Sequence, residues 1–371
     1  MRVAMLALHF AEYTLRLSRA LREQRREVLF VTYADHAANE LGRDWEAGAR
    51  SAGLRILVLE RPRHPGQVLR NVWRLRSALT AFAPDVIHSQ ETLRDELLLT
   101  LFSLPRCPFV LTVHDPAPHP GADSVNMGAR RLRYRNWLRG RARLAIVHGE
   151  ALRAALERES PHLAGRIRIA RHGPLGGPLQ PAPSTGGLLR LLFFGRVEAY
   201  KGLGCLVDAV RAVVNSGLRV EVVVAGRGSD LARHRAAMAE TGCFVVHDRY
   251  IPADGVANLF GECGVVVLPY VEGSQSGVAA MALGFGRAVL ATRVGAIPDL
   301  VRHGVNGILV PPADVAALAA AISQLAQDPA LLLRLGKGAR ELCDGELSWD
   351  AIGQQTCIVH EEASEPTELQ R

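Results

Sequence analysis

The chain has 371 residues, of which 48% are hydrophobic and 22% are charged, and its formal net charge is +7. This length exceeds that of one ordinary domain, and the composition excludes a disordered or fibrous chain. No apolar stretch reaches the roughly 18 residues of a membrane span, and the N-terminal apolar stretch is too short for a signal peptide. The six cysteines are scattered without metal-ligand spacing, which predicts reduced thiols. We therefore expect a cytoplasmic protein of two domains.

Short apolar segments alternate with helical patterns along residues 1–173. This alternation predicts a mostly parallel sheet with helices on both faces. The expected strands lie at residues 2–8, 27–33, 54–59, 85–90, 109–115, 144–149 and 167–173. Pro, Gly and Ser then crowd into residues 174–187, which predicts a linker. The alternation restarts with expected strands at residues 188–195, 219–226, 244–251, 265–270, 288–292 and 307–311.

This pattern predicts an α/β protein with two tandem Rossmann-like domains, residues 1–173 and 188–345. Residues 346–371 are expected to form a C-terminal helix and tail that packs back toward the first domain. Two doubly wound domains in tandem also predict a deep interdomain cleft at the carboxyl ends of the two sheets, where ligands of such sheets bind.

Lysine is almost missing from this sequence, because only residues 201 and 337 among the 44 Lys and Arg are Lys. Lys201 stands in the segment GRVEAYKG, residues 195–202, between an expected strand end and a helix that starts near Gly202. Arg196 lies in the same segment, so two cations are expected beside a helix N-terminus. This arrangement suits a phosphate or diphosphate, although a simple loop-capping role for Lys201 stays open.

A second loop with binding character follows the expected strand at residues 265–270. Glu272 precedes a run of small polar residues, 273–277, that leads into an Ala-rich helix. Such a loop presents free backbone N–H groups to an anion, and the carboxylate can accept hydrogen bonds from hydroxyls. A sugar on a diphosphate would satisfy both groups, whereas an ordinary exposed carboxylate is the alternative for Glu272.

Four segments of the second half, in this order and spacing, resemble the donor domain of the retaining glycosyltransferases of family four. They are GRVEAYKG, VVAGRGSD, residues 270–301 and NGILVPPADVAALAAAI. The first half is similar in a more generic way, through PDVIHSQ, PFVLTVHD, AIVHGEALRAAL and RIARHGP. The resemblance implies the GT-B architecture, with an acceptor-binding domain first and a nucleotide-sugar domain second.

The resemblance also implies roles for particular residues. Arg196 and Lys201 would neutralise the donor diphosphate, Glu272 would hold sugar hydroxyls, and His114 would lie near the reacting sugar carbon, or else be an ordinary core histidine. The other implied donor-binding residues are Gly195, Tyr250 and Ile251 near the nucleotide and Gly273, Ser274, Gln275, Ser276, Gly277 and Val278 near the sugar and phosphate. On the acceptor side we expect His9, Glu12, Tyr13 and Asp115.

Two features depart from the family pattern. The second acidic residue, which holds the ribose hydroxyls, falls at Ala279 or Ala280, and the glycine-rich loop after the first strand is replaced by LALHFAEYT. The missing carboxylate leaves a uridine-type or a deoxythymidine-type donor open. Two rivals stay open: a sugar-nucleotide epimerase, which shares the two-domain shape, and a catalytically silent nucleotide-sugar binding protein, which the missing acidic residue and the missing glycine-rich loop both suggest.

The sequence contains no Asp-x-Asp pair, so we expect no metal and no cofactor, with the cationic pair serving in place of a metal. The resemblance implies retention of configuration, and we favour attack from the front face. The expected partners are a nucleotide-sugar donor and an acceptor sugar, lipid-linked glycan or natural product.

An arginine-rich segment, residues 129–143, holds seven of the arginines. Its simplest interpretation is a solvated helix face, and its sharper ones are attraction to an anionic membrane surface or to an acidic partner or substrate. Aromatic residues make up only 5% of the chain and no nucleic-acid motif accompanies the charge, so we do not expect a nucleic-acid partner.

Overall fold

The computed structural model describes residues 1–104, 107–117, 128–176 and 187–366. The chain divides into two compact units. Unit 1 holds the N-terminal part up to Arg171 and the C-terminal segment from Trp349, and unit 2 covers His172–Ser348. Most of the predicted linker, residues 177–186, lies outside the described residues.

Unit 1 is built on a parallel sheet of seven strands in the order β3-β2-β1-β4-β5-β6-β7. This is the doubly wound order in which the sequence moves outward from β1 in both directions, as the alternating pattern predicts. The strands are β1 (Arg2–Ala7), β2 (Glu27–Tyr33), β3 (Arg55–Leu59), β4 (Val86–Gln90), β5 (Phe109–Thr112), β6 (Leu144–Val147) and β7 (Ile167–Ile169). The helices of unit 1 are α1 (Ala11–Glu23), α2 (Ala34–Leu41), α3 (Trp45–Ser51), α4 (Pro65–Phe82), α5 (Asp95–Ser103), α7 (Ala129–Arg141), α8 (Glu150–Glu159) and α16 (Trp349–Ser364), with a 3-10 turn at Pro161–Leu163.

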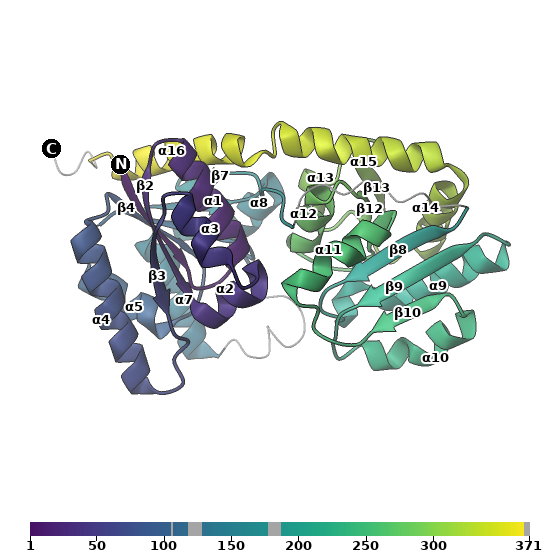
Figure 1. Cartoon of the computed structure of the whole chain (residues 1–371), viewed down its shortest axis with the longest axis horizontal. Coiled ribbons are helices and arrows are strands. Elements are labelled where there is room, and N and C mark those ends of the chain that lie inside the picture. The colour runs from purple at the N-terminus through teal and green to yellow at the C-terminus, as the bar shows by residue number, and fades with distance from the viewer. Residues whose placement is uncertain (105–106, 118–127, 177–186, 367–371) are drawn as a thin grey trace. The chain divides into compact units, whose positions relative to one another are not determined.

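Helix α16, the last segment of the chain drawn in yellow in Figure 1, lies beside α1 in unit 1. Val359 and Ala363 pack with residues of β4, β5 and β6 in one apolar cluster. Polar contacts fix the same helix, because Arg26 forms an ion pair with Glu361 and Arg168 donates through Nε to Glu362 Oε2 at 2.8 Å. The C-terminal helix is therefore part of the unit 1 fold.

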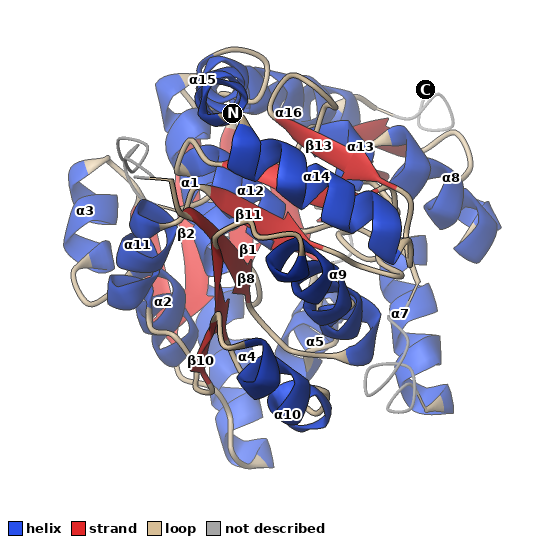
Figure 2. Cartoon of the chain, turned by 90° about the vertical axis from the view of Figure 1, so that its right-hand side faces the viewer, coloured by secondary structure: helices blue, strands red, loops and turns tan. Residues whose placement is uncertain are grey.

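Unit 2 repeats the same winding with six parallel strands in the order β10-β9-β8-β11-β12-β13. The strands are β8 (Leu189–Phe194), β9 (Val220–Ala225), β10 (Phe244–His247), β11 (Val265–Leu268), β12 (Ala288–Thr292) and β13 (Gly307–Val310). Its helices are α9 (Leu203–Asn215), α10 (Leu231–Thr241), α11 (Ala253–Glu262), α12 (Gly277–Gly284), α13 (Ile297–Leu300), α14 (Val315–Gln327) and α15 (Pro329–Asp344), with a 3-10 turn at Ala199–Lys201. Figure 2 shows these helices around the strands, with α9 and α14 side by side.

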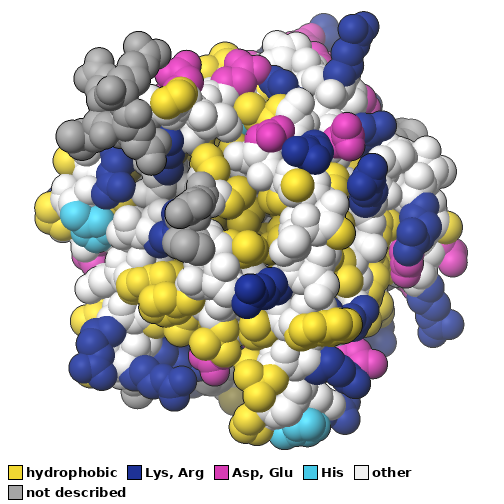
Figure 3. All heavy atoms as spheres, turned by 90° about the vertical axis from the view of Figure 1, so that its left-hand side faces the viewer, with side chains coloured by type: hydrophobic (Ala, Val, Ile, Leu, Met, Phe, Trp, Pro, Cys, Tyr) yellow, Lys and Arg dark blue, Asp and Glu magenta, His cyan; other side chains and the backbone are white. Residues whose placement is uncertain are grey.

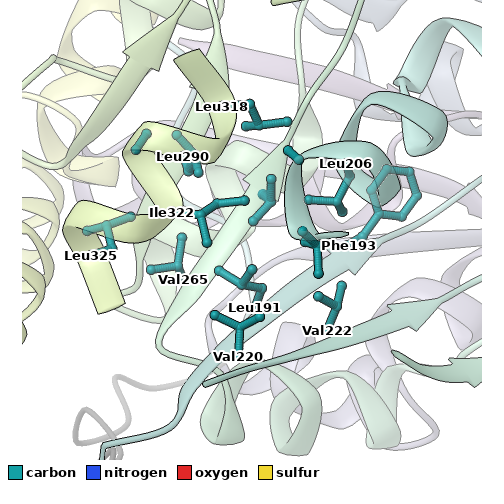
Figure 4. Packing of buried hydrophobic residues seen from close by; sticks show 14 of the residues in the cluster. Leu191, Phe193, Leu206, Val220, Val222, Val265, Leu290, Leu318, Ile322 and Leu325 are labelled. Carbon is teal, nitrogen blue, oxygen red and sulfur yellow. The ribbon is translucent and has the colours of Figure 1, made fainter. Parts of the chain in front are cut away.

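The core of unit 2 explains why its strands are mostly apolar at consecutive positions, with Arg190 and Glu221 as charged exceptions. Both faces of the sheet are covered, since α9 and α14 pack on one face and α11 and α12 on the other. Leu191 and Val265 from the sheet meet Leu206 of α9 and Ile322 of α14 in a cluster of buried side chains (Figure 4). Parallel strands covered on both sides need apolar residues at consecutive positions.

No single helix among the described residues has both the length and the apolar character of a membrane span. Two helical segments, Val315–Gln327 and Pro329–Ser364, meet those criteria only when taken together, and the chain bends by 100° between them.

Candidate functional site

The loop after β8 carries the two predicted phosphate-binding cations. The chain leaves the strand at Phe194, turns at Gly195 with a φ of 101°, and reaches the N-cap of α9 at Gly202 with a φ of 71°. A Cβ atom on Gly202 would lie 1.9 Å from the carbonyl oxygen of Pro269, directly after β11. Glycine is required at position 202 for two reasons: its backbone is left-handed, and a side chain would clash with the Pro269 carbonyl. This approach brings Lys201 to the end of β11.

Lys201 is held by aromatic side chains. Its Nζ donates to the hydroxyl of Tyr270 at 2.8 Å and lies 4.4 Å from the centre of the Tyr270 ring and 5.8 Å from that of Tyr200. The hydroxyl of Tyr270 in turn lies 3.3 Å from Oγ of Ser276. Within the described part of the chain, Lys201 forms no ion pair with a carboxylate, whereas Lys337 pairs with Glu341 at 3.4 Å. The ammonium charge is thus oriented without being neutralised.

Arg196 lies in the same loop, two residues after the last residue of β8, and is exposed. The segment VVAGRGSD, at the end of β9, holds this loop by two hydrogen bonds. Gly195 N donates to Ala225 O at 2.9 Å, and Val197 N donates to Arg227 O at 3.0 Å. Cβ atoms on Gly226 and Gly228 would lie 1.9 Å from Gly195 O and 2.0 Å from Val197 O. The glycines of this segment therefore let the two loops touch.

The loop after β11 presents Glu272 and the start of α12. The Glu272 side chain is exposed, and the preceding Val271 donates to Tyr200 O at 2.8 Å, which ties this loop to the lysine loop. Ser274 O accepts from Ala296 N at 2.6 Å. Gly273, Gln275, Gly277 and Val278 are half-buried along the same stretch.

Ser276 is the N-cap of α12, and its Oγ accepts from Ala279 N at 3.2 Å. A serine at this position satisfies one of the free backbone N–H groups of the first turn and leaves others available. Ala279 and Ala280 are buried, so the position of the family's second acidic residue carries only methyl groups.

Tyr250 and Ile251 follow β10 and differ in environment. Tyr250 is 54% exposed, whereas Ile251 is buried in the cluster that contains Phe260. Of the two, Tyr250 has the accessible ring that stacking on a nucleotide base requires.

His114 lies in unit 1, two residues beyond β5, and is buried. Its Nε2 is 2.8 Å from Gln90 Oε1, and its Nδ1 is 3.1 Å from His148 Nε2, whose other nitrogen donates to Ala170 O at 2.9 Å. This hydrogen-bond chain runs from the Gln90 side-chain amide to the carbonyl oxygen of Ala170.

Phe10 covers His114, which the sequence did not predict. The two rings stack with their centroids 3.9 Å apart, and Tyr13 meets His114 edge-on at 5.2 Å. Phe10 is the N-cap of α1 and has a φ of 56°, a left-handed conformation that costs a non-glycine residue about 1 kcal/mol or more. Phe10 is thus a bulky residue in a backbone conformation typical of glycine. It lies in the loop that is glycine-rich in the family that the sequence resembles.

The N-terminus of α1 is occupied by a side chain of unit 1. Glu40 Oε2 accepts from the backbone N–H of Glu12 at 2.9 Å, and burial raises the pKa of Glu40 to about 7. His9, two residues before the first residue of α1, is exposed, and the centroid of its ring lies 5.5 Å from that of His36. Asp115 directly follows His114 and is half-buried. Of the four predicted acceptor-side residues, His9, Glu12 and Tyr13 therefore surround the start of α1.

Most of the arginine-rich segment forms α7, and its arginines differ in burial. Arg130, Arg131 and Arg133 are exposed, as a solvated face requires. Arg139 is fully buried instead, where it donates through Nε to Glu91 Oε1 at 2.6 Å and through Nη2 to Glu91 Oε2 at 2.9 Å. Arg135 is also buried and pairs with Glu159 at 3.8 Å. The interpretation of the whole segment as a solvated face is thus wrong for these two residues, whose acidic partners lie far away in the sequence.

Known families match both units. Residues 10–171 match the family described as Glycosyl transferase 4-like domain, and residues 189–328 match Glycosyl transferases group 1. The alpha-maltose-1-phosphate synthase of Mycolicibacterium smegmatis is 28% identical over 345 residues, covering 81% of this chain and 87% of that protein. The D-inositol 3-phosphate glycosyltransferase of Streptomyces bingchenggensis is 33% identical over 183 residues, which are 46% of this chain and 40% of that protein.

Solved structures of similar fold cover the chain almost completely. Sucrose-phosphate synthase from Thermosynechococcus elongatus has a TM-score of 0.72 at 20% identity, covering 98% of each chain. HepE from Anabaena in complex with UDP has a TM-score of 0.71 at 18% identity, covering 98% of this chain and 100% of that chain.

Two Rossmann-like units, one of them with a cationic loop at its sheet edge, define a glycosyltransferase of the GT-B fold. The chain belongs to family four of these enzymes, as the two tandem matches indicate.

Proposed function

We propose that the protein transfers a sugar from a nucleoside-diphosphate sugar to an acceptor hydroxyl with retention of configuration and without a metal ion. The observation that carries this proposal is the Lys201 ammonium, held by Tyr270 at 2.8 Å without a carboxylate partner among the described residues. An oriented, unneutralised cation beside a helix start is suited to the charge that develops on a leaving diphosphate.

Arg196 and Lys201 would act as one cationic clamp. Arg196 offers a planar fork and Lys201 a compact point charge, so together they can contact several phosphate oxygens. This clamp stands in for the metal that other glycosyltransferases use to hold a diphosphate. The sequence also lacks an Asp-x-Asp pair to hold such an ion.

Glu272 would position the donor sugar. Its exposed carboxylate stands between the lysine loop and the start of α12, where it can accept hydrogen bonds from sugar hydroxyls. The backbone amides of residues 273–277 would meet the sugar and the second phosphate. Tyr250 would border the base, and His114 would lie near the reacting carbon once Phe10 no longer covers it.

The donor would carry uridine or deoxythymidine. HepE was solved with UDP and with UDP-glucose, which favours a uridine nucleotide. The methyl groups of Ala279 and Ala280 favour tolerance of deoxyribose, because no carboxylate at these positions needs a ribose hydroxyl as a partner. The acceptor would be a sugar, a lipid-linked glycan or a natural product. The names of two relatives, one a maltose-1-phosphate synthase and the other an inositol 3-phosphate glycosyltransferase, point to different acceptors.

The stacking of Phe10 on His114 supports one alternative function, a nucleotide-sugar binding protein without catalytic activity. If Phe10 stays on the histidine, unit 2 binds a nucleotide sugar but the chain does not transfer it, as in a silent binding protein.

A panel of nucleotide sugars, analysed by mass spectrometry with and without acceptors, tests the proposal. We expect slow release of free nucleoside diphosphate without an acceptor and a glycosylated product with one. Interconversion of the sugars would instead identify an epimerase, and binding without turnover would identify the silent protein. Product formation that stops on removal of divalent metal would contradict the cationic clamp.

A further inference from the structure

Three helices of unit 1, α4, α5 and α7, carry large hydrophobic side chains that are exposed. Leu69 and Trp73 on α4, Leu99 and Phe102 on α5, and Leu132 on α7 are each between 40% and 69% exposed. These are half of the exposed large hydrophobic side chains in the described part of the protein. Helices α4 and α5 are direct neighbours, and the rings of Phe102 and Trp137 stack at 4.5 Å to join α5 to α7. We call this surface the α4–α5–α7 face.

A cavity of about 720 Å³ opens between the same helices. Val68, Leu69, Leu98 and Leu99 form its apolar part. Arg63, Arg94, Arg130 and Arg131 line it as well, so its lining is both apolar and cationic. It therefore fits a ligand that joins an anionic group to hydrocarbon.

Basic side chains outnumber acidic ones among the described residues that line the cavity. Glu96, in the lining, is buried and its Oε1 accepts from Tyr33 Oη at 3.0 Å and from Asn71 Nδ2 at 3.2 Å. Asp95 is the exposed acid of the lining, and it lies 3.7 Å from Arg130. Among the described residues of the lining, four arginines thus accompany two carboxylates, of which only Asp95 is exposed.

Figure 3 shows the side of the molecule on which α4 lies, where patches of hydrophobic side chains border Lys and Arg side chains. Tryptophan, leucine and arginine together are typical of the interface between lipid headgroups and acyl chains, where an indole or aliphatic group is buried and a guanidinium meets phosphate. A nucleic acid would supply the phosphates but no hydrocarbon for Leu69, Leu99 and Phe102.

From this combination we propose that the α4–α5–α7 face docks on an anionic phospholipid bilayer, with a lipid headgroup phosphate in the arginine-lined cavity. The docking does not depend on glycosyl transfer, and it differs from the simple basic segment because α4 and α5 supply its apolar half. Buried Arg135 and Arg139 take no part in it.

Flotation of the full-length protein with vesicles tests the proposal. Vesicles of phosphatidylcholine with 30% phosphatidylglycerol, on the order of the anionic content that attracts basic segments, are compared with phosphatidylcholine alone. We expect binding to the anionic vesicles that is at least about tenfold stronger, a ratio equivalent to 1.4 kcal/mol. The apolar double variant Leu69→Ala/Trp73→Ala and the basic double variant Arg130→Gln/Arg131→Gln should each lose about tenfold or more.

Two exposed positions elsewhere serve as matched controls. Arg233 on α10 is 75% exposed and lies 3.7 Å from Asp230, which matches the 87% exposed Arg130 at 3.7 Å from Asp95. Ile358 on α16 is 65% exposed and matches Leu69 at 64%. Arg233→Gln and Ile358→Ala should leave vesicle binding unchanged, and circular dichroism checks that each variant is folded.

Four results would overturn the proposal. They are no binding to anionic vesicles, equal losses in the control variants, a stable dimer that Leu69→Ala/Trp73→Ala dissociates, and displacement of the protein from vesicles by short oligonucleotides but not by salt. Equal binding of soluble glycerophosphate by the wild type and the basic double variant would place the phosphate outside this cavity and overturn that part.

Discussion

Acidification should destabilise unit 1 through a buried histidine pair. His88 on β4 and His360 on α16 are fully buried, with His88 Nδ1 2.9 Å from His360 Nε2 and His88 Nε2 2.7 Å from Thr112 Oγ1. Burial lowers the pKa of His88 from 6.5 to about 3, and burial together with His88 and Arg26 lowers that of His360 well below 6.5. Both histidines are therefore neutral in the folded chain and can gain a proton once it unfolds.

The sign and size of the effect follow from this shift. A histidine whose folded pKa is depressed contributes stability above its unfolded pKa, and this stability is lost as pH falls from 6.5 toward the folded value. At pH 5, about 1.5 units below the unfolded pKa, protonation of the unfolded chain at His88 lowers the free energy of unfolding by about 2 kcal/mol. His360 adds to the loss in the same direction.

Urea unfolding followed by tryptophan fluorescence measures this loss, because all four tryptophans, Trp45, Trp73, Trp137 and Trp349, lie in unit 1. His88→Gln removes one titrating group, so its stability should fall about 2 kcal/mol less than that of the wild type between pH 7 and pH 5. The exposed His64→Gln is the matched control and should show the wild-type difference. An identical pH dependence for the wild type and His88→Gln would show that burial does not depress the pKa of His88.

Three further predictions concern the donor site. Lys201→Arg should raise the barrier to transfer by roughly 2.7 to 4 kcal/mol, because a planar fork cannot replace a compact ammonium, and full activity in a steady-state assay would disprove the clamp. Glu272→Ala should strongly reduce the rate of transfer but leave the nucleoside diphosphate affinity nearly unchanged in calorimetry. A fall in affinity as large as the fall in turnover would show that Glu272 does not act on the sugar alone. Uridine diphosphate and thymidine diphosphate should inhibit within about tenfold of each other, roughly 1.4 kcal/mol, because Ala279 and Ala280 offer no carboxylate to the ribose. A larger preference for uridine diphosphate would mean that another group reads the 2′-hydroxyl.

The sequence predicted well what depends on local pattern. The strand positions, the winding order and the two loops at the end of β8 and β11 follow from apolar periodicity and from glycines near strand ends. The scarcity of lysine sets Lys201 apart in the sequence, and the structure gives that residue an environment unlike that of Lys337.

Features set by distant contacts could not be predicted in this way. The hydroxyl of Tyr270 meets Lys201 because Gly202 lets two loops approach closely, and a lone tyrosine after a strand carries no signal of that approach. Arg139 is spaced like its exposed neighbours, yet Glu91 makes it a buried ion-pair residue. The stacking of Phe10 on His114 joins residues about a hundred positions apart.

We expect Lys201 to hold the donor diphosphate, and calorimetry with a nucleoside diphosphate measures this role. Uridine and thymidine diphosphate are titrated into the wild type, and the tighter of the two is then titrated into Lys201→Ala and into Lys337→Ala, the chain's other lysine. We predict at least about tenfold weaker binding, equivalent to 1.4 kcal/mol, for Lys201→Ala and unchanged binding for Lys337→Ala. Wild-type affinity in Lys201→Ala, or no binding of either nucleotide to the wild type, would rule out this role for Lys201.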